Sequence, residues 1–329
     1  MLPPPYRILP RSIAFFVPGF EGQSRPTDYV LAPEGIDCRK WFSGFSERVM
    51  AAVGRSFLPV CRMSDGEFML LFGHQPPSLR YSPMKRLAIR CRQSLGRVRQ
   101  RLRGFRAATA KGVSSGDMSY AEVVALRPEL SAAFARIASR GVLGIHLSYG
   151  KTPFQEHYFP AVGAWLNRNA ICLSPENYVP FYFVYALLRG PGFRDLVGGR
   201  RVLAVHSAAG AKREAITASL RDAGAAEVRW LPISPARSFM DRLDLKSVGK
   251  ADLCLVGAGV GKPRILEQLE PLNVPCIDAG YAFEVWANSD MQWDRPYMTP
   301  DAVLDVSRVR FLSAEDRAEF EAVRQQPSA

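Results

Sequence analysis

Arg201-Val-Leu-Ala-Val-His206 and Val274-Pro-Cys-Ile-Asp278 enclose the region of the chain with the clearest pattern. Between them, strand-like apolar segments alternate with segments of helical periodicity, the strands at 227–233 and 251–256 and the helices at 211–223, 238–248 and 263–272. Such an alternation predicts βαβ units, in which parallel strands form one sheet between two layers of helices. The sequence therefore predicts an α/β fold with a Rossmann-like, mostly parallel sheet and helices on both faces.

The same alternation continues less regularly toward the amino terminus. Helices are predicted at 40–53, 119–139 and 154–168, and strands at 57–61, 141–146 and 170–173. The expected organisation is a proline-rich leader (1–35), an α/β domain (36–290) and a carboxyl-terminal extension with a terminal helix (291–329).

Composition and cysteine usage exclude several classes of protein. The chain has 329 residues and is 47% hydrophobic, which excludes a disordered protein. The longest stretch without charge, 177–188, is shorter than the roughly 20 residues of a membrane-spanning helix. Arg7 and Arg11 interrupt the apolar leader, so a signal peptide is not expected. Six scattered cysteines without a C-x-x-C pair predict reduced thiols, no zinc site and a cytoplasmic location.

The net charge of +12 is concentrated in one segment, because no acidic residue occurs between Glu67 and Asp117. Apolar residues there recur at steps of three and four, which predicts a helix over 84–106 with a basic outer face and a buried stripe formed by Met84, Ala88, Cys91, Leu95, Val98 and Leu102. The basic face is either simply solvated, or attracted to anionic lipid at the inner membrane face or to a phosphate-bearing substrate. Nucleic acid is disfavoured because aromatic residues are not interleaved with the arginines.

The segment Arg62-Met-Ser64-Asp65-Gly66-Glu67-Phe68 has two interpretations. Ser64 followed three residues later by Glu67 is typical of a capping box at the start of a helix. Alternatively, Asp65 and Glu67 bind a divalent cation, Mn²⁺ or Mg²⁺, that bridges a diphosphate, because such cations prefer carboxylate oxygens.

A second loop, Gly257-Ala-Gly259-Val-Gly261-Lys262, matches neither the Walker A pattern nor the dinucleotide fingerprint. It is either a plain strand-to-helix turn or an anion-binding turn, to which Lys262 would add positive charge. The loop from Ser207 to Lys212 has the same two interpretations.

Two separate motifs resemble those of the GT-D fold glycosyltransferases, a bacterial family whose D-x-E motif serves the metal and the nucleotide sugar. The first comprises Arg62, Asp65-Gly66-Glu67-Phe68, Leu71 and Gly73, and the segment from Tyr81 to Leu95 is similar to the family's following basic helix. The second comprises Gly259, Ile265, Leu269 and Ile277-Asp278-Ala-Gly280. The chain departs from the family at Tyr281 and Phe283, where the family has histidine and an acidic residue.

The resemblance implies transfer of a sugar from a nucleotide donor, with UDP the expected nucleotide, to a glycan, lipid-linked or glycoprotein acceptor. It implies that Asp65 and Glu67 are the catalytic and metal-binding residues. The nucleotide is expected to contact Arg62, Gly259, Lys262, Asp278, Gly280 and Tyr281. The alternatives are a non-catalytic protein that binds a nucleotide or polyanion, and another nucleotide-dependent transferase such as a methyltransferase.

Overall fold

The computed structural model describes residues 6–10, 29–33, 36–72, 84, 87, 91, 120–146, 153–235, 237–294 and 308. Its centre is a seven-stranded sheet in which all hydrogen-bonded neighbours are parallel. In spatial order the strands are β5 (Tyr178–Pro180), β4 (Val142–Ile145), β3 (Leu58–Met63), β9 (Pro275–Asp278), β8 (Leu253–Gly257), β6 (Arg201–His206) and β7 (Glu227–Pro232). The predicted Rossmann-like α/β fold is therefore confirmed.

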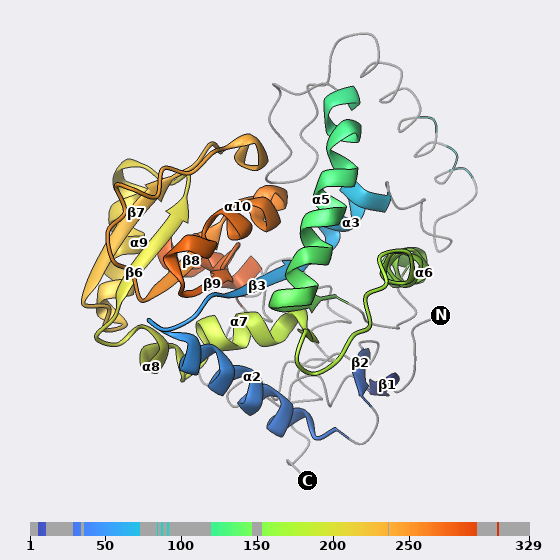
Figure 1. Ribbon diagram of the computed structural model, residues 1–329, viewed down its shortest axis with the longest axis horizontal. Helices are drawn as coiled ribbons and strands as arrows, with labels where there is room; N and C mark the ends of the chain where they lie inside the picture. The colour runs from blue at the N-terminus through green and yellow to red at the C-terminus, as the bar shows by residue number, and fades with distance from the viewer. Residues whose placement is uncertain are drawn as a thin grey trace.

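Helices cover both faces of this sheet (Figure 1). They are α2 (Cys38–Ala52), α3 (Asp65–Phe72), α5 (Tyr120–Arg140), α6 (Pro153–Arg168), α7 (Phe181–Arg189), α8 (Phe193–Val197), α9 (Gly210–Asp222), α10 (Lys262–Gln268) and α11 (Ala282–Ala287). Helices α5 and α10 pack together over β3 on one face, while α7 packs on β3 and β4 and α11 packs on α9 and α7. The short 3₁₀ helices are η2 (Ser238–Met240), η3 (Gly259–Gly261), η4 (Glu270–Leu272) and η5 (Ser289–Asp294).

The central strands are buried on both sides, which explains their nearly continuous apolar sequence. Every residue of β3 and of β9 is buried, and so are the first four residues of β8. Trp41 of α2 closes one side of the core against Phe183 of α7, with ring centroids 5.3 Å apart. Among the buried residues of the described strands, Arg62 and Asp278 are the charged ones. Both lie near the carboxyl ends of their strands, β3 and β9.

Two predicted elements are wrong. Residues 170–173 form no strand; Asn177 instead folds this segment into a turn, accepting a hydrogen bond from Ser174 N and donating one to the Cys172 carbonyl. The strand β5 follows the turn. Side-chain hydrogen bonds of this kind compete with regular secondary structure.

The helix predicted at 238–248 is reduced to η2. The amide of Leu243 and the carbonyl of Asp241 are both bonded to the side chain of Gln268 in α10, at 3.0 Å each. A neighbouring helix therefore satisfies backbone groups that a helix at 238–248 would have satisfied internally.

Other predictions concern segments that the structure describes only in part or not at all. In the leader, β1 (Tyr6–Pro10) and β2 (Tyr29–Pro33) form a separate antiparallel pair. Of the basic segment 84–106, only residues 84, 87 and 91 are described; they are helical, but the predicted burial is wrong at Met84, which is 76% exposed, and at Cys91. The predicted terminal helix lies outside the described residues. Among the described helices, none is both long and apolar enough to cross a membrane.

Candidate functional site

The candidate site lies where β3 and β9 end side by side. After β3 the chain enters α3, which packs on α5, whereas after β9 it enters α11, which packs on α9 and α7. The two connections thus leave toward opposite faces of the sheet. In open parallel sheets a crevice that binds ligands forms at such a point, outside the carboxyl ends of the strands.

Four charged side chains meet beneath this point. They are Arg62 of β3, Glu67 of α3, Lys262 at the start of α10 and Asp278 at the end of β9, and each residue is 5% exposed or less. Charged residues are rarely buried to this extent unless they are paired. The two cations and two carboxylates form one paired group, called here the buried charge cluster.

Asp278 holds the buried charge cluster together. Its Oδ1 accepts a hydrogen bond from Arg62 Nη2 at 3.0 Å, and its Oδ2 accepts one from the Arg62 backbone amide at 3.2 Å. The same Oδ2 lies 3.0 Å from Lys262 Nζ. Arg62 Nε donates in addition to the Asp278 carbonyl at 3.1 Å. The ends of β3 and β9 are therefore joined by both backbone and side-chain contacts.

Glu67 joins α3 to the same cluster. Its Oε1 lies 2.8 Å from Lys262 Nζ, and its Oε2 accepts a hydrogen bond from the backbone amide of Ser64 at 2.9 Å. The latter contact is the carboxylate half of the capping box that the sequence predicted as one alternative. One side chain thus caps α3 and neutralises a buried ammonium.

In the buried charge cluster, each charged group favours the charged form of its partners and so opposes the effect of burial. Burial alone would raise the pKa of Asp278, but the positive charges of Arg62 and Lys262 outweigh this effect and lower it. Burial would likewise lower the pKa of Lys262, but Asp278 and Glu67 raise it above its ordinary value. Arg62 is further enclosed by Tyr185, whose ring centroid lies 4.0 Å from the guanidinium carbon.

Glycines allow the turns around the cluster to come close. Gly280 has φ +45°, and a Cβ atom at this position would lie only 1.9 Å from Arg62 Nη2. Gly259, with φ +53°, is the first residue of η3, and η3 ends immediately before Lys262. Residues with positive φ strongly favour glycine, so both turns depend on it.

The structure brings together five of the eight residues singled out in the sequence: Arg62, Glu67, Lys262, Asp278 and Gly280. Gly259 lies in the adjoining turn, and the Tyr281 hydroxyl donates to the Met291 carbonyl at 3.3 Å. Asp65 is the first residue of α3, and the structure does not describe its side chain. Tyr185, which contacts the Arg62 guanidinium, was not among the residues singled out in the sequence.

The described residues do not fit a divalent cation at Glu67. Both oxygens of Glu67 already have a partner, and the ammonium of Lys262 lies between Glu67 and Asp278, where a metal shared by these carboxylates would bind. A metal there would also be repelled by two buried cations. Among the described side chains, no three from His, Cys, Asp and Glu are grouped as metal ligands.

A second polar group lies nearby, at the end of β6. His206 Nδ1 accepts a hydrogen bond from the Ala208 amide at 2.8 Å, and its ring centroid lies 4.5 Å from that of Phe283. Lys212 of α9 and Glu284 of α11 form an ion pair at 2.7 Å. In the Ser207–Lys212 loop, which the sequence offered as a candidate anion site, Lys212 is therefore already paired with the carboxylate of Glu284.

His206 is expected to make stability depend on pH. Burial and the charge of Lys212 lower its pKa from 6.5 to about 4, so the unfolded chain binds a proton more readily than the folded protein does. The stabilisation that neutral His206 provides is fully present above pH 6.5 and is lost as the pH falls toward 4. The loss is about 3 kcal/mol in the free energy of unfolding.

Urea unfolding at pH 7.5, 5.5 and 4.5 measures this effect. The His206→Gln variant, which lacks the titrating ring, is expected to lose markedly less stability between pH 7.5 and 4.5 than the parent. Equal losses in the two proteins would assign the pH dependence to other groups.

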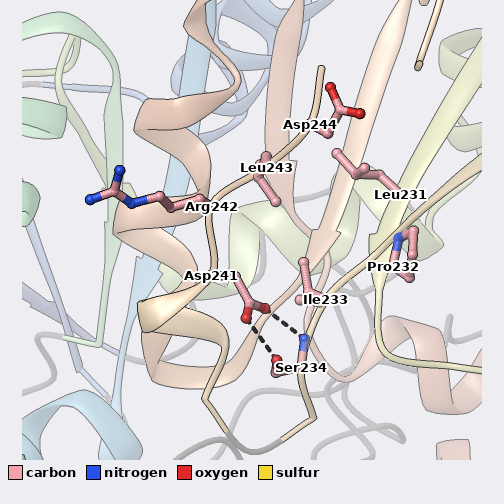
Figure 2. A pocket seen from close by; sticks show the side chains of 8 residues that line it. All are labelled: Leu231, Pro232, Ile233, Ser234, Asp241, Arg242, Leu243 and Asp244. Atoms are coloured by element: carbon pink, nitrogen blue, oxygen red, sulfur yellow. Dashed lines mark hydrogen bonds between the residues drawn. The ribbon is translucent and has the colours of Figure 1, made fainter. Parts of the chain in front are cut away.

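A pocket of about 320 Å³ lies at the carboxyl end of the edge strand β7, and none of the residues singled out in the sequence lines it. Asp241 points toward Ser234 and accepts hydrogen bonds from its amide and its hydroxyl, while Arg242 extends away from the other lining side chains (Figure 2). It is lined by Leu231, Pro232, Ile233, Ser234, Asp241, Arg242, Leu243 and Asp244.

In comparisons with protein-family models, curated proteins and solved structures, no match to the chain was found.

Proposed function

We propose that the protein is a glycosyltransferase that takes its sugar from a nucleotide donor, with UDP the expected nucleotide, and binds the donor diphosphate above the buried charge cluster. One observation carries the proposal. The two motifs that resemble the GT-D glycosyltransferases are separated by 216 residues at Arg62 and Asp278, yet these side chains are bonded to each other at adjacent strand ends. The chain thus joins its two motifs at the position where parallel sheets bind ligands.

Transfer of a sugar at this position requires groups that stabilise the leaving diphosphate and a base for the acceptor. The bond from the anomeric carbon to the diphosphate oxygen breaks, a bond to an acceptor hydroxyl oxygen forms, and the hydroxyl proton passes to a base. The leaving diphosphate gains negative charge, which preorganised cations and amides stabilise. Gly66, Gly259 and Gly280 are partly exposed around the cluster, so a phosphate could approach the backbone there without meeting side chains.

The acceptor is proposed to be a glycan, a lipid-linked oligosaccharide or a glycoprotein. The basic segment 84–106 would serve association with an anionic membrane surface rather than the chemical step, since its charges far exceed those of one diphosphate.

A non-catalytic nucleotide-binding protein is the second candidate. Both carboxylates of the buried charge cluster are bound to cations of the chain itself, so neither is poised to accept the proton of an acceptor hydroxyl. This pairing favours binding without transfer.

Incubation of the full chain with a panel of nucleotide sugars, with and without Mn²⁺, separates the candidates. A glycosyltransferase is expected to release UDP slowly by hydrolysing its own donor, at a rate above that of a blank without protein. UDP binding without hydrolysis of any donor would support the second candidate. Absence of both binding and hydrolysis would contradict the donor site itself.

A further inference from the structure

The ammonium of Lys262 is buried between two carboxylates. Its Nζ lies 2.8 Å from Glu67 Oε1 and 3.0 Å from Asp278 Oδ2. An ammonium has three hydrogens to donate. Within the part of the chain that the structure describes, two oxygens accept from Lys262, which leaves its third hydrogen to donate to a ligand oxygen.

The two carboxylates that hold Lys262 are themselves fixed. Ser64 N binds the second oxygen of Glu67, and Arg62 binds Asp278 through its backbone amide and its guanidinium. Three segments of the chain therefore fix the position of the ammonium: the end of β3 with the start of α3, the start of α10 after β8, and the end of β9. A cation held in this way requires little rearrangement when a ligand arrives, which is the property that a metal centre would otherwise supply.

We propose, building on the donor site proposed above, that the Lys262 ammonium takes the place of the divalent cation and itself contacts the donor diphosphate, so that a nucleoside diphosphate binds without a metal. The carboxylates of Glu67 and Asp278 position this ammonium instead of ligating a metal. The D-x-E motif then retains its glutamate in a different role, as the partner of a lysine at the start of α10.

The alternative role for the cluster is purely structural. A structural cluster would stabilise the fold but would not make nucleotide affinity depend on the ammonium. The experiment must therefore measure nucleotide and metal binding rather than stability alone.

Calorimetric titration of the full chain with UDP, once in EDTA and once in Mn²⁺, tests the inference. The two dissociation constants are expected to agree within about twofold, since no metal is needed. Binding that appears only with Mn²⁺, or that Mn²⁺ tightens by about tenfold or more, would overturn the inference and leave the donor site standing. No binding in either buffer would contradict the donor site, and with it the inference that rests on it.

A variant makes the test specific to the ammonium. Lys262→Met is expected to weaken UDP binding in EDTA by about tenfold or more, because a charge-assisted contact is lost. Mn²⁺ is expected to restore part of the affinity, since Glu67 then has no cationic partner and Asp278 keeps only Arg62. Lys250→Met, at an exposed lysine, is the matched control and is expected to bind as the parent does.

Unchanged UDP affinity in folded Lys262→Met would overturn the inference. Circular dichroism checks the fold of the variant. If the variant fails to fold, the comparison of EDTA with Mn²⁺ in the parent decides the question. Electron paramagnetic resonance of Mn²⁺ adds a measurement without nucleotide: stoichiometric binding to the parent that Glu67→Gln abolishes would place a metal at Glu67 and contradict the inference.

Discussion

Replacement of Asp278 by alanine is expected to lower the free energy of unfolding by about 3 to 5 kcal/mol, the cost typical of leaving a buried charge unpaired. Asp278 is 1% exposed and is the common partner of Arg62 and Lys262, so its loss leaves the guanidinium without its carboxylate and the ammonium with Glu67 alone. Urea unfolding of the purified variant at pH 7.5 measures the change.

Asp222→Ala is the matched control, because Asp222 is exposed at the end of α9. It is expected to change stability by no more than about 0.5 kcal/mol, as surface substitutions usually do. A loss below about 1 kcal/mol in Asp278→Ala would mean that the cluster contributes far less than a buried ion pair.

Gly280→Ala is expected to destabilise the protein by about 2 to 4 kcal/mol, from the positive φ at this residue together with overpacking against Arg62. The added Cβ would lie 1.9 Å from Arg62 Nη2, so the guanidinium must move away from Asp278 or the turn after β9 must open. Either shift disturbs the proposed donor site. UDP affinity, by calorimetry on the folded fraction, is therefore expected to fall as well.

Gly44→Ala is the control for this substitution. Gly44 lies within α2, and a Cβ there would meet no atom within 4 Å. This change is expected to stabilise the protein by about 0.5 to 1 kcal/mol, because alanine is the better helix former. Similar stability effects at the two glycines would contradict the tight contact between Gly280 and Arg62.

The sequence predicts the layered fold well because the alternation of strands and helices is local information. Strand order is not local: β9, the last strand of the sheet in the chain, lies between β3 and β8. This insertion is what brings Asp278 beside Arg62. The individual residues of the site were therefore recognisable in the sequence, whereas their mutual pairing was not.

The role of Glu67 also depends on a contact between distant segments that the sequence does not reveal. A glutamate three residues after Ser64 predicts a capping box, and a D-x-E motif predicts a metal ligand, and both patterns occupy the same positions. The deciding contact comes from Lys262, at the start of α10, which follows a different strand. Predicting that contact requires the arrangement of β3, β8 and β9 at the centre of the sheet.

Hydrogen–deuterium exchange with and without saturating UDP tests most directly whether the nucleotide binds above the buried charge cluster. If it does, slower exchange is expected in peptides that cover 62–68, 257–262 and 278–282, since ligand contact suppresses local opening of these turns. Slower exchange confined to 231–244, around the pocket beside β7, would place the nucleotide elsewhere and contradict the account.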